Sequence, residues 1–110
     1  MRRRRAQMIK LLYCEGRLKA EGHAGAAKRG EDLICAGASA LIYALACSLE
    51  AAQERGEASG VRARLDSGDA EIRWDNGPYA RAAAETTMCG LMAMARAYPK
   101  CISVENRKDE

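Results

Sequence analysis

GEDLICAGASALIYALACSLEAAQERG, residues 30–56, is the stretch of sequence on which the fold depends. Its apolar side chains recur every three or four residues, which is the spacing of one face of an α-helix. Asp32 is a suitable cap for the start of this helix, and Gly56 is suited to close it after Arg55. We therefore predict a helix from Asp32 to about Arg55, with an apolar stripe formed by Ile34, Ala38, Leu41, Leu45 and Leu49.

The segments on either side of this helix predict strands and one further helix. Alternating patterns favour two hairpins, one with strands at 8–14 and 17–21 and one across 60–75. A second helix is expected to start at Pro78 and end before Pro99, with a buried stripe formed by Ala84, Met88, Leu91, Ala95 and Tyr98. A short strand at 101–105 completes the order β-β-α-β-β-α-β. We expect an α+β fold in two or three layers, with both helices packed on a small, mainly antiparallel sheet.

Composition places the chain among single soluble domains. Its 110 residues are 48% hydrophobic and 30% charged, and they include no apolar run long enough to span a membrane. The basic run Arg2–Arg5 is not followed by the apolar stretch of a signal peptide, so we expect a cytoplasmic protein without a membrane partner. We divide the chain into a basic tail at 1–7, a domain at 8–106 and a charged tail at 107–110.

The net charge of +3 depends on the N-terminal arginines, because the rest of the chain carries −1 without them. Three interpretations of Arg2–Arg5 stay open: an electrostatic contact with RNA, a solvated tail, or residues upstream of a true start at Met8. The five cysteines are odd in number and contain no C-x-x-C spacing, so neither a disulfide framework nor a zinc site is expected. No metal or cofactor is expected.

The single histidine, His23, lies twelve residues before Cys35, which is expected near the start of the predicted helix. A base and a thiol are the minimum parts of nucleophilic cysteine chemistry, and a helix N-terminus favours the thiolate. At about the third helical position, Cys35 would have uncommitted N–H groups around it that could hold an oxyanion. Asp32 and Ser39 would share its helix face. Asp32 either caps the helix or orients His23, and Ser39 either bonds within the site or back-bonds to the Cys35 carbonyl.

The sequence around this pair reads Gly22-His23-Ala24-Gly25, followed by Gly30-Glu31-Asp32-Leu33-Ile34-Cys35-Ala36-Gly37-Ala38-Ser39-Ala40. This motif resembles that of the ribosomal-processing cysteine protease family, Prp. The resemblance extends over roughly residues 8–106. It implies a cysteine endopeptidase that forms homodimers and removes the N-terminal extension of large-subunit ribosomal protein twenty-seven. It also implies that His23 and Cys35 are the catalytic pair, with Asp32 and Ser39 as supporting residues. The sequence departs from common family versions at Ala26 and Ala38, where small residues would alter a subsite.

The segment between the pair, residues 22–31, is predicted to be a loop that contacts substrate through Gly22, Ala24, Gly25 and Gly30. Its glycines suit a lid that closes over substrate, and an ordinary surface loop is the alternative. Two other functions compete with proteolysis. One is a non-catalytic ribosome- or phage-associated binding module of the same fold, and the other is a thiol redox protein, for which a resolving cysteine at close spacing is missing.

Overall fold

The computed structural model describes residues 8–22, 29–66 and 68–107. Of residues 29–32 it describes the backbone but not the side chains. In chain order the described elements are β1 (Ile9–Cys14), β2 (Arg17–Glu21), α1 (Arg29–Glu54), β3 (Arg62–Asp66), β4 (Asp69–Arg73), α2 (Pro78–Ala97) and β5 (Ile102–Asn106). This confirms the predicted order β-β-α-β-β-α-β. The predicted basic tail at 1–7 lies outside the described residues, as do residues 108–110 of the predicted charged tail at 107–110.

The described strands form one mixed sheet in the order β3-β4-β2-β1-β5. Four neighbouring strands pair antiparallel, whereas β1 and β5 pair parallel, with Ile9 opposite Ile102. The amide of Ile9 also donates to the Cys101 carbonyl oxygen at 2.8 Å. The first and last strands of the chain are therefore neighbours, and the sheet is mainly antiparallel as predicted.

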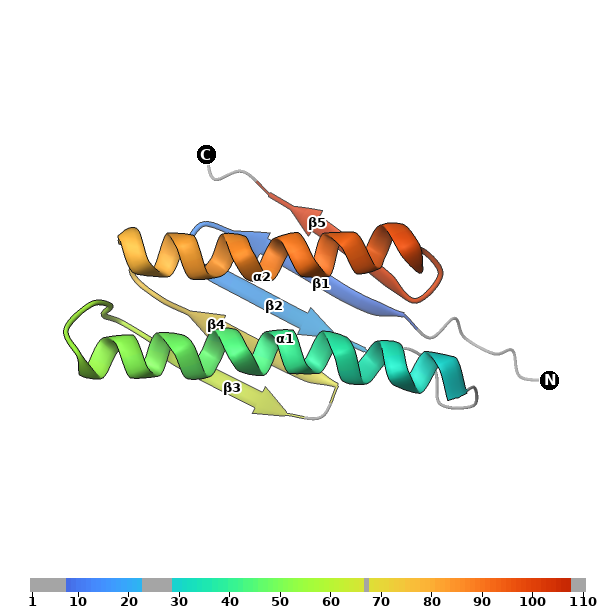
Figure 1. The fold of residues 1–110 in the computed structure, drawn as a ribbon, viewed down its shortest axis with the longest axis horizontal. Coiled ribbons are helices and arrows are strands. Elements are labelled where there is room, and N and C mark those ends of the chain that lie inside the picture. Colours follow the sequence, from blue (N-terminus) through green and yellow to red (C-terminus); the bar gives the residue numbers. More distant parts are fainter. Residues whose placement is uncertain (1–7, 23–28, 67, 108–110) are drawn as a thin grey trace.

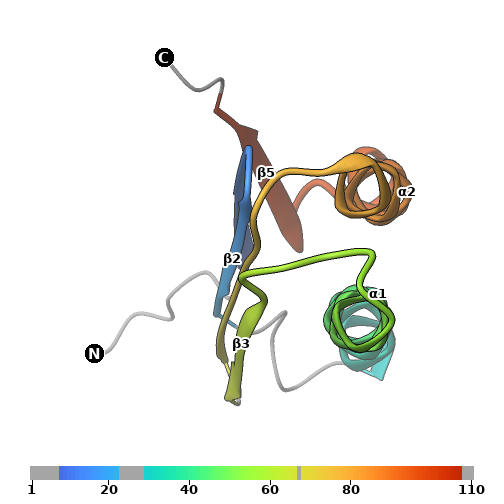
Figure 2. The same ribbon diagram turned by 90° about the vertical axis from the view of Figure 1, so that its left-hand side faces the viewer.

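Both helices lie side by side on one face of the sheet, which makes the domain a two-layer structure (Figures 1 and 2). Inward-facing strand residues alternate with polar residues on the uncovered face, as a half-buried strand requires. The core between the layers is built on large, fully buried side chains from both helices and from the sheet: Leu18, Leu45, Leu49, Ile72, Leu91 and Ile102. The helices run close together where Gly90 meets Leu41, since a Cβ at position 90 would lie 3.0 Å from the Leu41 Cδ1.

Several local signals in the sequence act as predicted. Gly56 adopts a left-handed φ of 84° just after α1, and the amide of Glu57 donates to the Ala52 carbonyl oxygen at 2.8 Å. This is the hydrogen-bond pattern of a glycine-terminated helix. Pro78 is the first residue of α2, where its missing N–H costs no hydrogen bond.

Two expectations about the helices were wrong. Helix α1 begins at Arg29, three residues before the predicted start, so Asp32 lies inside the helix and does not cap it. Acidic residues such as Glu31 and Asp32 are favourable in a first helical turn, and they extend the helix towards the N-terminus. Tyr98, assigned to the buried stripe of α2, is the residue that ends the helix and is 48% exposed. Its amide still donates to the Met94 carbonyl oxygen, while its ring turns outwards.

Helix α1 is apolar over most of its length. In the described part of the chain, Leu33–Glu54 has the length and composition of a segment that could cross a membrane, contrary to our expectation. The inner residues Leu45, Leu49 and Ala52 are buried in this domain. Core helices pass the same test of length and composition, and we assign α1 to the core.

Candidate active site

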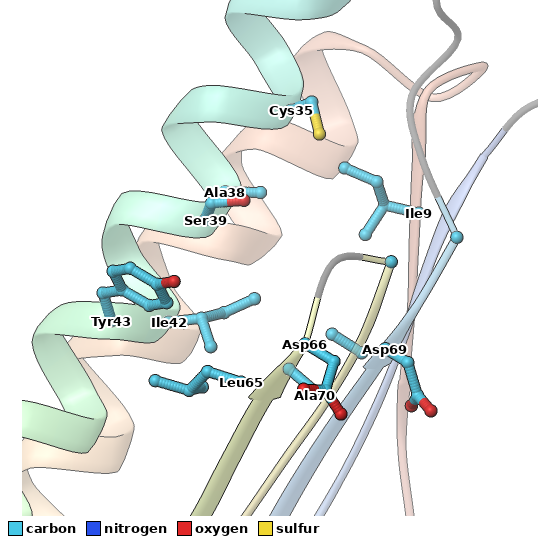
Figure 3. Close-up of a pocket in the computed structure, with 13 residues that line it drawn as sticks. Ile9, Cys35, Ala38, Ser39, Ile42, Tyr43, Leu65, Asp66, Asp69 and Ala70 are labelled. Atoms are coloured by element: carbon cyan, nitrogen blue, oxygen red, sulfur yellow. The ribbon is translucent and has the colours of Figure 1, made fainter.

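A cavity of about 360 Å³ opens between the first half of α1 and the end of the β3–β4 hairpin (Figure 3). We call it the cleft. Its walls come from three parts of the fold: Cys35, Ala38, Ser39, Ile42 and Tyr43 from α1; Ile9, Ala20 and Gly22 from the β1–β2 hairpin and its end; and Leu65, Asp66, Gly68, Asp69 and Ala70 from the second hairpin. The floor is apolar, and the polar groups lie at the rim.

The helical wall of the cleft presents residues at the spacing of one helix face. Cys35, Ser39 and Tyr43 follow one another at intervals of four residues, and Figure 3 shows the Cys35 sulfur directed into the space between α1 and the strands. Cys35 is half-buried against the core, whereas Ser39 and Tyr43 are exposed. The thiol thus has a fixed wall behind it and open space in front of it, as a nucleophile needs.

The opposite wall carries two carboxylates that share one counterion. The Arg64 guanidinium lies 3.4 Å from Asp66 and 3.1 Å from Asp69, measured between nitrogen and carboxylate oxygen. These contacts raise the pKa of Arg64, with the hydrogen bond to Asp69 as the largest cause. In Figure 3 both carboxylates lie at the far end of the cleft from the Cys35 sulfur. Asp66 and Asp69 therefore bound the end of the cleft away from the thiol, while their carboxylates pair with Arg64 on the sheet face that the helices leave uncovered.

His23 lies outside the described residues, as do Ala24 and Gly25. The residue before them, Gly22, lines the cleft, and its amide donates to the Gly68 carbonyl oxygen at 2.9 Å. Gly22 has a φ of 97°, and a Cβ there would collide with the Met8 carbonyl oxygen. The segment that carries His23 therefore starts at the cleft edge, and it ends where α1 begins. The structure leaves the predicted pairing of His23 with Cys35 a prediction.

The early start of α1 changes three details of the predicted site. Cys35 is the seventh residue of the helix, beyond the first four whose N–H groups lack helical partners. The expectation that its own surroundings supply free N–H groups for an oxyanion was therefore wrong. Gly30, predicted to be part of the substrate loop, is the second residue of α1. Asp32 stays within one helical turn of Cys35, but as an interior residue.

Most of the wall that faces Cys35 was not predicted from the sequence. Asp66, Asp69 and their neighbours reach the cleft because β4 pairs with β2, which sets Asp69 beside Glu21 and Ala70 beside Ala20. Such long-range pairing leaves no local sequence signal. Tyr43 did have a signal, since it lies eight residues after Cys35 on the same helix face.

Among residues 8–22, 29–66 and 68–107, no group of three or more His, Cys, Asp or Glu side chains is placed to hold a metal ion. The five cysteines are free thiols in the structure, and Cys35 is one of the half-buried ones.

The fold and the cleft together define a small cysteine-hydrolase domain, with a thiol on a helix at the side of a cleft wide enough for a side chain. The chain belongs to the Prp family of ribosomal-processing cysteine proteases, because the family described as cysteine protease Prp matches residues 13–103. It is therefore a cysteine peptidase of the ribosomal-processing type.

Individual relatives agree with this assignment. The ribosomal processing cysteine protease Prp of Mycoplasma pneumoniae is 32% identical over 108 residues, which cover 94% of this chain and all of that protein. Two crystal structures of the essential ribosomal processing protease Prp from S. aureus share the fold. The complex with a covalently linked product peptide has a TM-score of 0.73 and a sequence identity of 24%. The complex with a substrate peptide has a TM-score of 0.74 and a sequence identity of 22%. Each covers 91% of this chain and 100% of the S. aureus chain.

Proposed function

We propose that this chain is the endopeptidase that removes the N-terminal extension of large-subunit ribosomal protein twenty-seven during ribosome assembly. Membership of a ribosomal-processing family supports the substrate class. The S. aureus relatives have been crystallised with a substrate peptide and with a covalently linked product peptide, which supports a polypeptide substrate and a covalent step.

In the proposed mechanism Cys35 is the nucleophile and His23 the general base. His23 takes the thiol proton, and the thiolate attacks the scissile carbonyl carbon. The imidazolium then protonates the leaving amine as the C–N bond breaks. Water, deprotonated by His23, releases the acyl group from the sulfur. Asp32 and Ser39 support the pair, with Ser39 one helical turn from Cys35 on the wall of the cleft.

The observation that carries the proposal is the position of the Cys35 thiol at the side of a cleft with an apolar floor. A cavity of about 360 Å³ accepts a large side chain next to the scissile bond, and Ile42, Leu65 and Ala70 surround that space with apolar atoms. Ala38, buried at the floor, leaves room that a larger residue would fill.

The proposal includes a homodimer that acts in the cytoplasm, where a reducing environment keeps a catalytic thiol free. Support for a dimer comes from the outer face of α1, where no charged residue occurs from Leu33 to Leu49 and where Leu33 and Tyr43 are 69% and 55% exposed. Sedimentation analysis should show a dimer that Ala44→Glu, on this face, dissociates. A wild-type chain that stays monomeric would contradict it. Contact of Arg2–Arg5 with ribosomal RNA also stays part of the proposal.

The decisive experiment compares cleavage of the purified precursor by four forms of the chain, with the products identified by mass spectrometry. Wild type and Cys47→Ala should release the extension, since Cys47 is an exposed thiol on the same helix outside the cleft. Cys35→Ala and His23→Ala should release none of it while remaining folded. Cleavage by the Cys35→Ala variant would show that another group is the nucleophile.

A further inference from the structure

One face of the sheet is left uncovered by the helices (Figure 2). On this face the charged residues are sorted by position along the strands. Arg17 of β2, Arg73 of β4 and Arg62 of β3 are register partners across three neighbouring strands, and we call them the arginine row. Their strand neighbours Leu18 and Ile72 are buried beneath the helices, so the row projects from the opposite face. Like charges placed directly opposite one another destabilise a sheet, and such a row is therefore a costly arrangement.

A single carboxylate organises two members of the row. Glu71 accepts from the Arg17 Nε at 2.7 Å and from the Arg73 Nε at 3.1 Å, both through its Oε2 atom. Its side chain is only 18% exposed. The hydrogen bond from Arg73 lowers the pKa of Glu71; burial opposes this, and the charge of Arg17 adds to the lowering. Glu71 is thus an ionised group that fixes the planes of two guanidinium groups.

Because both arginines use Nε for this contact, their Nη groups stay available. Neither Nη group of Arg17 or Arg73 forms a hydrogen bond with any other described residue, and Arg62 forms no ion pair within the described chain. Paired Nη groups are the fork with which arginine binds a phosphate in a bidentate way. The row minus Glu71 leaves an excess of two positive charges in one strip of surface.

The other end of the same face has the opposite sign. Glu21, Asp69 and Asp66 are register partners on the same three strands, four residues along β2 from Arg17, or about 13 Å. Arg64 and Lys19 bind these carboxylates, which stand at the end of the sheet near the cleft. A polyanion would be attracted to the arginine row and repelled from the cleft end.

From this geometry we infer that the arginine row is a binding surface for the phosphates of an RNA backbone. An extended row on an open face matches phosphates that follow one another along a strand better than it matches one isolated anion. Two shallow grooves flank the row, one containing Arg64 and Glu71 and the other containing Gly16 and Gly60, and Arg62 and Arg73 line both. The surface lies at the opposite end of the sheet from Cys35, so an enzyme held on RNA there keeps its cleft open.

The test measures binding of a fluorescently labelled single-stranded oligouridylate to the full chain by anisotropy, between about 0.05 and 0.2 M salt. The variant is Arg62→Gln with Arg73→Gln, and the matched control is Arg55→Gln with Arg96→Gln. The control removes two charges from the helical layer and, like the variant, keeps Arg2–Arg5. Each lost phosphate contact lowers the salt slope by about 0.7, which is about fivefold in affinity at 0.1 M.

The row variant should bind about 25-fold more weakly than wild type at that salt, with a slope shallower by about 1.4. The control should keep the wild-type slope, and both variants should cleave a short peptide at the wild-type rate. Equal affinity and slope in variant and control would overturn the inference, as would a wild-type chain that does not bind the RNA. A fall in sedimenting mass for the row variant alone would show that the row binds the acidic residues of a second copy, and would also overturn it. Because peptide cleavage is measured separately, failure here leaves the proposed protease function untouched.

Discussion

Replacement of Gly22 by alanine tests how closely the cleft edge is packed. Gly22 and Gly56 both have left-handed backbone angles, with φ values of 97° and 84°, but their surroundings differ. A Cβ at position 56 would meet nothing within 4 Å, whereas one at position 22 would collide with the Met8 carbonyl oxygen. Gly56→Ala is therefore a matched control that carries the backbone strain without the collision.

The magnitudes follow from these contacts. A left-handed residue with a side chain costs about 1 kcal/mol, and this is the whole expected loss for Gly56→Ala. In Gly22→Ala the backbone at Met8, just before β1, must also shift, which costs about 1 kcal/mol or more. The shift weakens the 2.9 Å hydrogen bond from Gly22 to Gly68, worth about a further 1 kcal/mol. We expect Gly22→Ala to cost about 3 kcal/mol, roughly 2 kcal/mol more than the control.

Urea denaturation measures this difference as a gap between the two midpoints of about 1 M. Gly22→Ala should also slow precursor cleavage, because Gly22 lines the cleft and immediately precedes His23. Equal losses of stability in the two variants would refute the reasoning. They would mean that the Met8 backbone does not approach position 22 as the structure describes.

Three further predictions concern the sheet face, the helix pair and the tail. The pKa of Glu71 is lowered from its ordinary 4.5, so its contribution to stability is full above that value and is lost as the pH falls through the lower folded-state pKa. Wild type should therefore lose more stability than Glu71→Gln between about pH 5 and pH 3 in urea titrations, and parallel curves would contradict this. Tyr79→Phe removes the 2.5 Å hydrogen bond with Ser48 and should cost about 1 kcal/mol. Ser48→Ala should add little to it in a double-mutant cycle, and full additivity would show that the bond contributes nothing. Deletion of residues 1–7 should leave the melting temperature and the peptidase rate unchanged, and a drop as large as that of a core mutation would place the tail within the fold.

Much of the fold was predictable because local patterns agreed with one another. Alternation in 17–21, the glycine at 56 and the proline at 78 each act within a few residues, and each forms the structure that its chemistry favours. The helix start was not predictable to the residue, since Gly30 weakens helical propensity while the acidic side chains after it favour a first turn. The exposure of Tyr98 depends on where α2 leaves the sheet, which no local spacing encodes.

The candidate site also contains one part that was predictable from the sequence and one part that was not. Cys35, Ser39 and Tyr43 lie on one wall because helical spacing puts them there, and the sequence contains that spacing. Asp66 and Asp69 reach the cleft only through the pairing of β4 with β2, a contact across some fifty residues of chain. The sequence pattern of a single strand does not specify which other strand it pairs with. This wall of the cleft could therefore be identified only from the structure.

The parallel pairing of β1 with β5 has a consequence for synthesis. Until residues through Asn106 have left the ribosome, β1 is an unpaired edge of the sheet, and Ile9 lacks Ile102 beside it. Ile9 also lines the cleft, so a chain that ends before β5 lacks the strand that pairs with one of the cleft residues. Completion of the sheet beside the cleft therefore depends on synthesis of the last strand.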